Sequence, residues 1–521
     1  MIDGGSECTV GSKHVFYASE CGARLDSDVI AGGGTDDTAA LQAVLDKAPA
    51  LGSLHLVVDG AALVRGLDVH SHTTITCLNA SCGFFLAPQS NRAVLRNAHP
   101  DPEHRRDVNI TLEGGTYNQD ARNQVHRHVM TPRAYRSRRG TDWHVVSGLE
   151  FFGVENLVIR GITIRNQRTF ALFLTNWYRV TLENIVIDCP DDFWYQAYRR
   201  KFETGAGEIP GGNQDGIHVQ GPGQFLTMRS IQGNSWDDFI ALNADDYLAA
   251  PGASGGDITD VLIDGVFLNN ALQGIRLMSS QARMDRIRIR NVTGTYRWFG
   301  FIVDAFCDPL FDGDTLGTVA GNFGTVLLEG IDLRQTEGSS FDKPWPPFLF
   351  KIGGRHESLV LRDIVINEPA FPGSPIRFDA DWNPADIRSL LVDGLRVVAS
   401  NAAAAEAPYL AMGGTVDLLA IRNVEIARSA AMPRAGCVLE LGKGTRMALV
   451  TLSGITANRL RALVSVAEGS VGTLHLANVL ATELAEAVVS VGDAAIGTLR
   501  AEGVREPILS MRGGGKVAAD A

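Results

Sequence analysis

The sequence lacks an apolar run of about 18 residues, so it predicts no membrane-spanning helix. It also lacks an excess of basic charge, because 47 Lys and Arg face 59 Asp and Glu. The resulting net charge of −12 disfavours nucleic acid and anionic membranes as partners. The seven cysteines include no Cys-x-x-Cys pair, which argues against a zinc site. We expect free buried thiols, and the disulfides Cys77–Cys82 or Cys8–Cys21 are the alternative.

The opening residues do not predict a leader. Residues 1–5 begin neither a basic n-region nor an apolar h-region, so they do not start a signal peptide. The sequence predicts either a cytoplasmic protein or a secreted or periplasmic protein whose leader has been removed. Its 521 residues, 45% of them hydrophobic and 20% charged, are ample for a large folded core.

Glycine is abundant, with 56 residues, and it recurs with Asn, Asp and Ser inside short alternating apolar segments. Residues 157–164 read Leu-Val-Ile-Arg-Gly-Ile-Thr-Ile, and residues 180–187 read Val-Thr-Leu-Glu-Asn-Ile-Val-Ile. The interrupting residues are Gly161, Asn184, Ser230, Gly265, Asn291, Gly330, Asp363, Gly394, Asn423, Gly454, Asn478 and Gly503. Most gaps between them are 23 to 39 residues. Alternation broken by a turn residue predicts two short strands joined by a bend.

A repeat of this length and content predicts an all-β solenoid. Each coil buries its inward Val, Ile and Leu only by stacking on its neighbours. A β-sandwich is the alternative, and the absence of a fixed strand spacing of about 8–12 residues disfavours it. We predict a single domain over residues 1–521, with coils at 51–510 and a tail at 511–521.

The first 50 residues are expected to cap the N-terminal end of this solenoid. A Gly-rich stretch at residues 32–38 precedes a helical pattern with one apolar stripe, formed by Ala40, Leu41, Val44, Leu45 and Ala48. Thr35, Asp36 or Asp37 can cap the start of the helix, and Pro49 is expected to stop it.

Two segments interrupt the repeat, and we expect both to be inserted loops. Residues 119–143 contain six arginines and no acid between 121 and 140, and they end at Trp143. Residues 189–214 are rich in aromatic side chains, among them Trp194 and Tyr195. Insertions in repeat proteins often project on the binding face, where aromatic rings can stack on sugars. The alternative is solvated loops with a few packed aromatics.

Three aspartates are expected to meet near the second insertion. Asp215 follows Asn213-Gln214, and Asp237 and Asp238 precede a Phe-Ile-Ala-Leu segment. Asp215 and Asp237 are 22 residues apart, which is about one coil. Crowded carboxylates disfavour mutual ionisation and are typical of acid/base catalysis, with turn chemistry and cation binding as alternatives. Adjacent strand residues point to opposite faces, so joint action of Asp237 and Asp238 requires a bulge or a turn.

These motifs resemble those of pectin-lyase-like proteins, and in particular the polygalacturonase-type glycoside hydrolases of family 28. The resemblance spans about residues 30–300 and rests on residues 35–42, 112–118, 213–217, 237–242 and 274–278. It implies a right-handed parallel β-helix with an N-terminal capping helix. It also implies a glycosidase that cleaves a poly- or oligosaccharide with no cofactor and no metal.

The resemblance also implies residue roles. Asp237 would be the general acid, and Asp215 and Asp238 would position and deprotonate a water, so that the reaction inverts the anomeric carbon. Arg276 would hold a substrate carboxylate. His218 lies three residues after Asp215 and would reach the site, and a hydrogen-bonded histidine on the wall is the alternative.

Two departures from the family pattern argue against polygalacturonate as the substrate. Residues 239–275 contain no His, so the family's Gly-His-Gly histidine has no counterpart, and Met278 replaces the Lys of Arg-Ile-Lys. Another sugar, or another glycosidase family on the same fold, is therefore favoured.

Two other functions fit the same fold. A polysaccharide lyase would need a basic proton abstractor and usually Ca²⁺ at the acids. A carbohydrate-binding adhesin would need no catalysis, and fold alone does not distinguish these classes. A homo-oligomer formed through the apolar C-terminal coils is left open.

Overall fold

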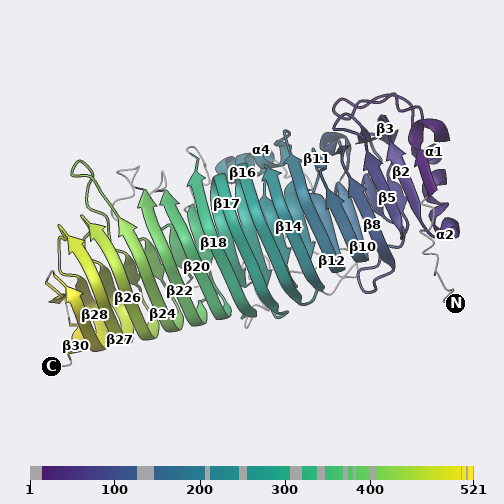
Figure 1. The fold of residues 1–521 in the computed structure, drawn as a ribbon. Helices are drawn as coiled ribbons and strands as arrows, with labels where there is room; N and C mark the ends of the chain where they lie inside the picture. Colours follow the sequence, from purple (N-terminus) through teal and green to yellow (C-terminus); the bar gives the residue numbers. More distant parts are fainter. Residues whose placement is uncertain are drawn as a thin grey trace, which may run out of the picture.

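The chain is an elongated rod of stacked coils, with its two ends far apart (Figure 1). This computed structural model describes residues 14–125, 146–205, 212–245, 255–305, 320–336, 347–367, 373–379, 383–398, 407–505, 507–511 and 514–519. Within them, strands form one continuous ladder in which each coil pairs in parallel with the next, as in β12 (Phe170–Asp188) and β14 (Gly223–Gly233). The predicted right-handed parallel β-helix is confirmed.

The strand pairings divide the ladder into three strips that run along the rod. One strip carries β4 (Leu67–Val69), β7 (Leu95–Asn97), β13 (Asp215–Gln220), β15 (Asp238–Asn243), β19 (Phe348–Ile352), β21 (Ile376–Phe378), β23 (Leu410–Met412), β25 (Leu439–Leu441) and β29 (Leu509–Met511). A second carries β1 (His14–Tyr17), β2 (Leu54–Val58), β5 (Thr73–Cys77), β8 (Asp107–Glu113) and β30 (Lys516–Ala519). The third begins with β3 (Ala61–Val64), β6 (Gly83–Leu86), β9 (Thr116–Asn118) and β11 (Thr163–Arg165).

Longer strands bend from one strip into another. They are β10 (Leu149–Arg160), β12, β14, β16 (Ile258–Ser279), β17 (Met284–Ala305), β18 (Phe323–Gln335), β20 (Arg355–Asn367), β22 (Asp386–Val398), β24 (Thr415–Ile426), β26 (Arg446–Asn458), β27 (Val464–Thr482) and β28 (Val489–Val504).

The core is built from columns of apolar side chains in register. One column runs through Leu157, Val180, Leu226, Val261, Ile287, Val326, Leu359, Leu390, Leu419, Val450 and Leu474. None of these side chains is more than 2% exposed. The alternation of the sequence therefore becomes a continuous apolar interior.

The bends lie where the sequence predicted them. All twelve interrupting residues have a positive φ, from 52° at Asp363 to 80° at Gly265. This left-handed conformation is readily adopted by Gly and is tolerated by Asn and Asp, which explains the choice of residue types. Successive bends stack, so that a Cβ added at Gly265 would lie 3.6 Å from the backbone nitrogen of Ser230.

Helices cover the N-terminal end of the rod, as predicted (Figure 1). The helix α1 (Thr38–Leu45) buries Leu41, Val44 and Leu45. The expected stop at Pro49 is wrong, because α1 ends at Leu45 and Pro49 lies in the first turn of a second helix, α2 (Ala48–Leu51). A proline is accommodated there because the amide groups of a first turn have no helical partner.

Capping also differs in detail from the expectation. Asp37 occupies the cap position, but its carboxylate accepts hydrogen bonds from the amides of Arg24 and Leu25. The carboxylate of Asp36 accepts hydrogen bonds from the amide and the hydroxyl of Thr38 instead.

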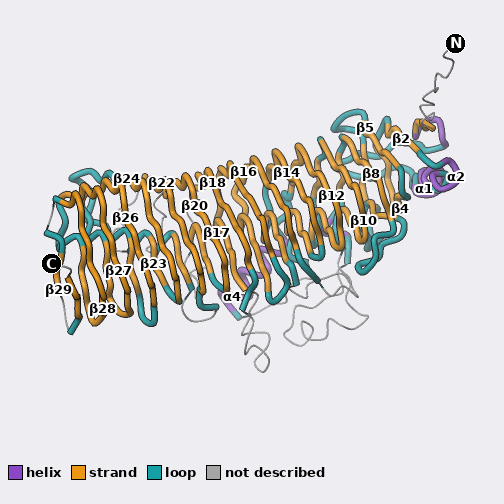
Figure 2. Tube along the Cα trace, turned by 60° about the horizontal axis from the view of Figure 1, so that its bottom comes forward, coloured by secondary structure: helices purple, strands orange, loops and turns teal. Residues whose placement is uncertain are grey.

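The second predicted loop contains a helix. Residues 193–204 form α4 (Phe193–Thr204), which lies against the side of the rod (Figures 1 and 2). Short 3₁₀ turns occur at η1 (Ala18–Cys21) and η2 (Ala121–Asn123). The predicted tail also contains a strand, β30, which pairs with β28. Among the described residues, no helix is long and apolar enough to span a membrane.

The bends give a first prediction. Replacing Gly265 by Val should destabilise the fold by about 1–2 kcal/mol, because a β-branched residue is strained at a φ of 80°. Gly265→Asn is the matched control and should cost less, since Asn184 and Asn291 already occupy equivalent bends. Urea unfolding followed by circular dichroism measures both. Equal losses for Val and Asn would contradict the conformational explanation.

Candidate functional site

The candidate site lies on the outer face of the first strip, where β13, β15 and the end of β16 run side by side. Asp215 is the first residue of β13, and Asp238 is the first residue of β15. The register pairs Ile217 with Ile240, which places Asp215 beside Asp238 one coil apart.

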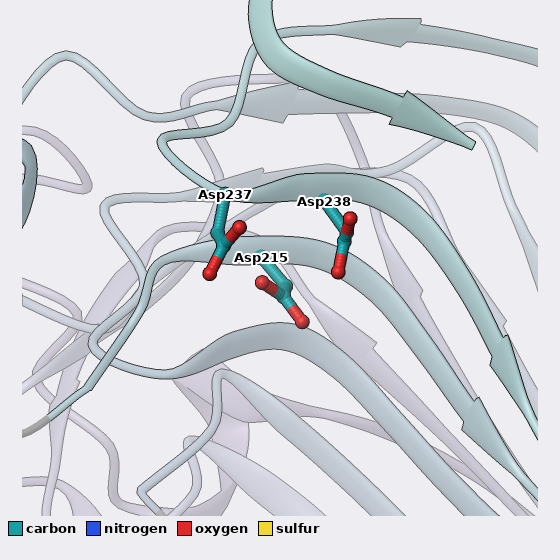
Figure 3. A group of neighbouring side chains, drawn as sticks. All are labelled: Asp215, Asp237 and Asp238. Carbon is teal, nitrogen blue, oxygen red and sulfur yellow. The ribbon is translucent and has the colours of Figure 1, made fainter. Parts of the chain in front are cut away.

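The three aspartates come together, as the sequence predicted. One carboxylate oxygen from each of Asp215, Asp237 and Asp238 lies within 4.8 Å of the other two. All three carboxylates project from the same side of the strands (Figure 3). Asp237 lies in the bend that precedes β15, outside the regular strand. This bend supplies the turn that adjacent aspartates need to share one face.

Backbone hydrogen bonds to neighbouring segments fix the position of the chain at Asp215 and Asp237. The amide of Asp215 donates to the carbonyl of Thr169 at 2.8 Å. The carbonyl of Asp237 accepts from the amide of Gln273 at 3.2 Å, and the amide of Trp236 donates to the carbonyl of Gln214. The acids are therefore held by the coils on both sides of them.

Asp237 is surrounded by groups that favour its protonated form. Burial and the charges of Asp238 and Asp215 raise the pKa of Asp237 well above its usual value. The guanidinium of Arg276 and a hydrogen bond from Asn213 oppose this rise without cancelling it. The side-chain amide of Gln273 also donates a hydrogen bond to Oδ1 of Asp237 at 2.5 Å.

Asp238 forms an ion pair with Arg276. Its carboxylate is 1% exposed, and a guanidinium nitrogen of Arg276 contacts it directly. Burial raises the pKa of Asp238, while Arg276 and then His218 act to lower it. Arg276 pairs in register with Ala241, three residues after Asp238 on the neighbouring strand. Arg276 therefore faces an acid of the site as well as solvent.

His218 is part of the site. Its Nδ1 lies 3.1 Å from Oδ2 of Asp215, and its side chain is 2% exposed. The ring stacks on Phe170 with centroids 4.0 Å apart and meets Phe173 edge-on at 5.3 Å. The nitrogen Nε2 lies 3.4 Å from the side-chain nitrogen of Asn243. These contacts fix the imidazole against Asp215.

Trp194 and Tyr195 lie near the site but are buried. They are 3% and 1% exposed, so their rings offer no open face to a sugar. They pack with Leu272, Trp236 and Trp298, and the ring of Tyr195 stacks on that of Trp236 at 5.2 Å. Their contacts hold α4 against the bend that carries Asp237. Trp143 lies outside the described residues.

Sequence reasoning missed two residues of the site. They are Gln273, whose side chain contacts Asp237, and Trp236, which precedes Asp237 in the chain. Gln273 stands 36 residues after Asp237, about one coil later, and this spacing was the available signal. The helix α4 also had a signal, because Asp191 and Asp192 precede it and basic residues follow in its last turns.

The donor set suits proton chemistry better than a divalent cation. Three carboxylates are the right ligand type for Ca²⁺ or Mg²⁺. Here, however, Arg276 already neutralises Asp238, and the raised pKa of Asp237 favours a protonated, weakly ligating group.

The crowding of Asp237 gives a second prediction, on stability. A raised folded-state pKa means that the native state binds the proton more tightly, so stability falls as pH rises from about 4 towards that pKa. Asp237→Asn keeps the oxygen that accepts from Gln273 and removes the charge. Its stability advantage over the wild type should grow with pH, by about 1.4 kcal/mol for each unit of raised pKa.

Thermal unfolding of both proteins between pH 4 and pH 8 tests this. The control is Asp260→Asn, because Arg286 holds the pKa of Asp260 below its usual value and the sign of the effect should reverse. A constant difference between Asp237→Asn and the wild type at all pH values would show that Asp237 is not crowded.

No family model matches the sequence. No curated protein matches it either. Solved structures are similar in fold, and one is a family 28 exopolygalacturonase from Yersinia enterocolitica, with a TM-score of 0.46 and 13% identity over 91% of this chain and 78% of that chain. A mannuronan C-5 epimerase A-module from Azotobacter vinelandii has a TM-score of 0.42 and 12% identity over 97% and 100% of the two chains. An adhesin from Streptococcus pneumoniae has a TM-score of 0.41 and 11% identity over 94% and 100%. These similarities concern the fold and assign no chemistry to this chain.

Proposed function

We propose that this protein is a glycoside hydrolase in which Asp237 is the general acid and Asp215 and Asp238 activate a water. The observation that carries the proposal is the crowding of Asp237. Its raised pKa keeps a proton available, while the other two acids are held by His218 and Arg276.

The proposed reaction is one displacement at the anomeric carbon. Asp237 donates its proton to the glycosidic oxygen as the bond from that oxygen to the anomeric carbon breaks. A water attacks the anomeric carbon from the opposite side, and its proton passes to Asp215 or Asp238. The products are two shorter glycans, and Asp237 regains its proton from solvent.

The anomeric outcome separates two versions of this reaction. Acids of inverting enzymes are usually roughly 6.5–9.5 Å apart, and those of retaining enzymes about 5–5.5 Å. The spacing of up to 4.8 Å by itself favours retention. Asp238 and Asp215 are each engaged by a partner side chain, however, which makes them poorer nucleophiles and better holders of a water. We therefore propose inversion.

A lyase on the same face would need an unprotonated base. Arg276, the guanidinium at the acids, pairs with Asp238 and stays charged. This arrangement favours hydrolysis. Ultraviolet absorbance from an unsaturated uronide among the products would identify a lyase instead.

The third prediction concerns activity. Asp237→Asn should lower kcat on the responsive glycan by about 10²–10⁴-fold, which is the usual contribution of a positioned general acid. A panel of oligo- and polysaccharides, assayed by release of reducing ends, measures the loss. Asp260→Asn changes the same residue type near the start of β16, where Asp260 pairs with Arg286, and should retain activity. Full activity of Asp237→Asn would show that Asp237 is not the general acid.

Anomer-resolved NMR of the first products tests inversion in the same assay. Retention would show that Asp215 or Asp238 attacks the sugar directly.

The fourth prediction concerns pH. The reaction should require Asp238 to be ionised and Asp237 to be protonated, so the plot of kcat/KM against pH should be bell-shaped. Both limbs should lie at a pH above the usual pKa of an Asp, because the pKa of each acid is raised. Arg276 lowers the pKa of both acids, so Arg276→Met should move both limbs to higher pH. Arg276→Lys keeps the charge and should shift them less. Unmoved limbs in Arg276→Met would contradict the assigned roles.

A further inference from the structure

A row of alternating charges runs along the outer face of the second strip. One charged side chain per coil stands directly before a bend, and its neighbours in register carry the opposite sign. The members in order are Glu113, Arg160, Glu183, Arg229, Asp264, Arg290, Glu329, Arg362, Asp393 and Arg422. We call these residues the charge ladder. Figure 1 shows this face towards the viewer, where β14, β18 and β20 run side by side with no helix in front of them.

Only part of the charge ladder is paired within the chain. Three neighbouring couples form ion pairs, namely Glu113–Arg160, Asp264–Arg290 and Glu329–Arg362. The other four members are exposed or half-buried and have no ion-pair partner among the described residues: Glu183, Arg229, Asp393 and Arg422. The carboxylate of Asp393 accepts a hydrogen bond at 2.8 Å from the neutral side chain of Asn423. Two acids and two arginines therefore keep charges that a second molecule can pair with.

A mostly apolar stripe runs beside the charge ladder. It lies two residues earlier in each strand, so both rows point outward on either side of a buried row that includes Leu182 and Ile263. Its members are Thr181, Thr227, Leu262, Arg288, Leu327, Val360, Leu391 and Ala420. All except Arg288 are half-buried and uncharged, and the guanidinium of Arg288 pairs with Glu329 at 2.7 Å. A continuous row of partly exposed aliphatic side chains is typical of a surface that another protein covers.

The charge ladder is complementary to itself. From Glu183 to Arg422, four acids alternate with four arginines. Reversing the order of an even, alternating row also reverses the sign at every place. A two-fold axis parallel to the strands, placed between Arg290 and Glu329, reverses the order of the coils and keeps each position along the strand. In such a dimer, ladder faces ladder and stripe faces stripe.

The four charges that lack an ion pair would meet one another across this axis. Glu183 would face the partner's Arg422, and Arg229 would face the partner's Asp393. The inner members of the ladder would also face opposite charges. Complementary charges of this kind fix the register in which two surfaces dock.

We propose that the outer face of the second strip is the interface of an antiparallel homodimer. The chain as a whole carries a net charge of −12, which opposes association, but the acids of this face are balanced by its arginines. Eight strands about 4.8 Å apart and about five residues long form a face of roughly 600 Å². Two such faces bury roughly 1,200 Å², which is the lower end of the range for specific interfaces. The candidate site lies on the first strip and stays open, so the inference does not depend on the proposed reaction.

Sedimentation velocity of the full chain tests for the dimer. We expect the wild type to be mainly dimeric at about 100 μM, with a dissociation constant on the order of 1–10 μM, because an interface of this size is weak. A chain that remains monomeric at about 100 μM would contradict the proposal.

Charge reversal combined with mixing locates the interface. Arg229→Glu and Asp393→Arg should each raise the dissociation constant at least about tenfold, because each places two pairs of like charges across the axis. An equimolar mixture of the two variants should dimerise like the wild type. In the mixed dimer the new glutamate faces the new arginine, and the native Asp393 and Arg229 face each other in the second contact. Both variants keep their altered contacts within the chain, so this recovery does not come from folding.

The matched controls are Arg334→Glu and Asp332→Arg. They make the same reversals at exposed positions of β18 on the third strip, and they should sediment like the wild type.

A second pair of variants tests the stripe. Val360 would face the partner's Leu262, so Val360→Glu should raise the dissociation constant about tenfold or more, because it buries a charge against an aliphatic side chain. Val365→Glu makes the same change at a half-buried position of the same strand on the third strip and should leave the dimer intact. Thermal midpoints of both variants show whether either substitution unfolds the chain.

Two further results would overturn the inference. One is a mixture of Arg229→Glu and Asp393→Arg that dimerises no better than either variant alone. The other is a dimer that persists through both charge reversals and through Val360→Glu, because its interface would then lie elsewhere on the rod.

Discussion

Stacking of each coil on its neighbours is the interaction on which this structure depends. One coil leaves the faces of its inward Val, Ile and Leu exposed, and only the next coil in register covers them. The column from Leu157 to Leu474 shows the result, because every member is almost fully buried. A shift of register by one residue would turn these side chains outward. The apolar columns therefore fix the position of every residue on the outer face as well.

The candidate site is a consequence of this fixed register. Asp215 and Asp238 start neighbouring strands, so their carboxylates lie side by side, and the bend before β15 adds Asp237. Free side chains would move apart to relieve the repulsion among three acids. Here the coils hold them together, and the repulsion appears as a raised pKa of Asp237. The core thus supplies the energy that keeps a proton on this acid.

The same outer face carries a row of polar groups along the rod. His218 and Arg276 each engage one of the acids, and Lys351 lies two strands further on between Asp304 and Asp379. In each case a cation or an imidazole faces a carboxylate.

Much of this could be predicted from the sequence, because its determinants are local. A bend requires a residue that tolerates a positive φ, so Gly161, Asn184 and their equivalents marked the coils correctly. The apolar stripe of residues 40–48 marked the capping helix, although Pro49 misled the prediction of its end. Because Asp215 and Asp237 are about one coil apart in the sequence, their spacing predicted that the acids would meet.

Tertiary structure decided what depends on contacts between distant segments. Trp194 and Tyr195 looked available to a sugar, but α4 turns them inward against Leu272 and Trp236. Gln273 and Lys351 acquire their carboxylate partners only when coils of unequal length come into register. The sequence by itself determined the solenoid, its bends and the acid cluster, since periodicity and residue type are written along the chain. The burial, pairing and protonation of each side chain were decided by the fold, because these depend on which neighbours the stacked coils bring within a few ångströms.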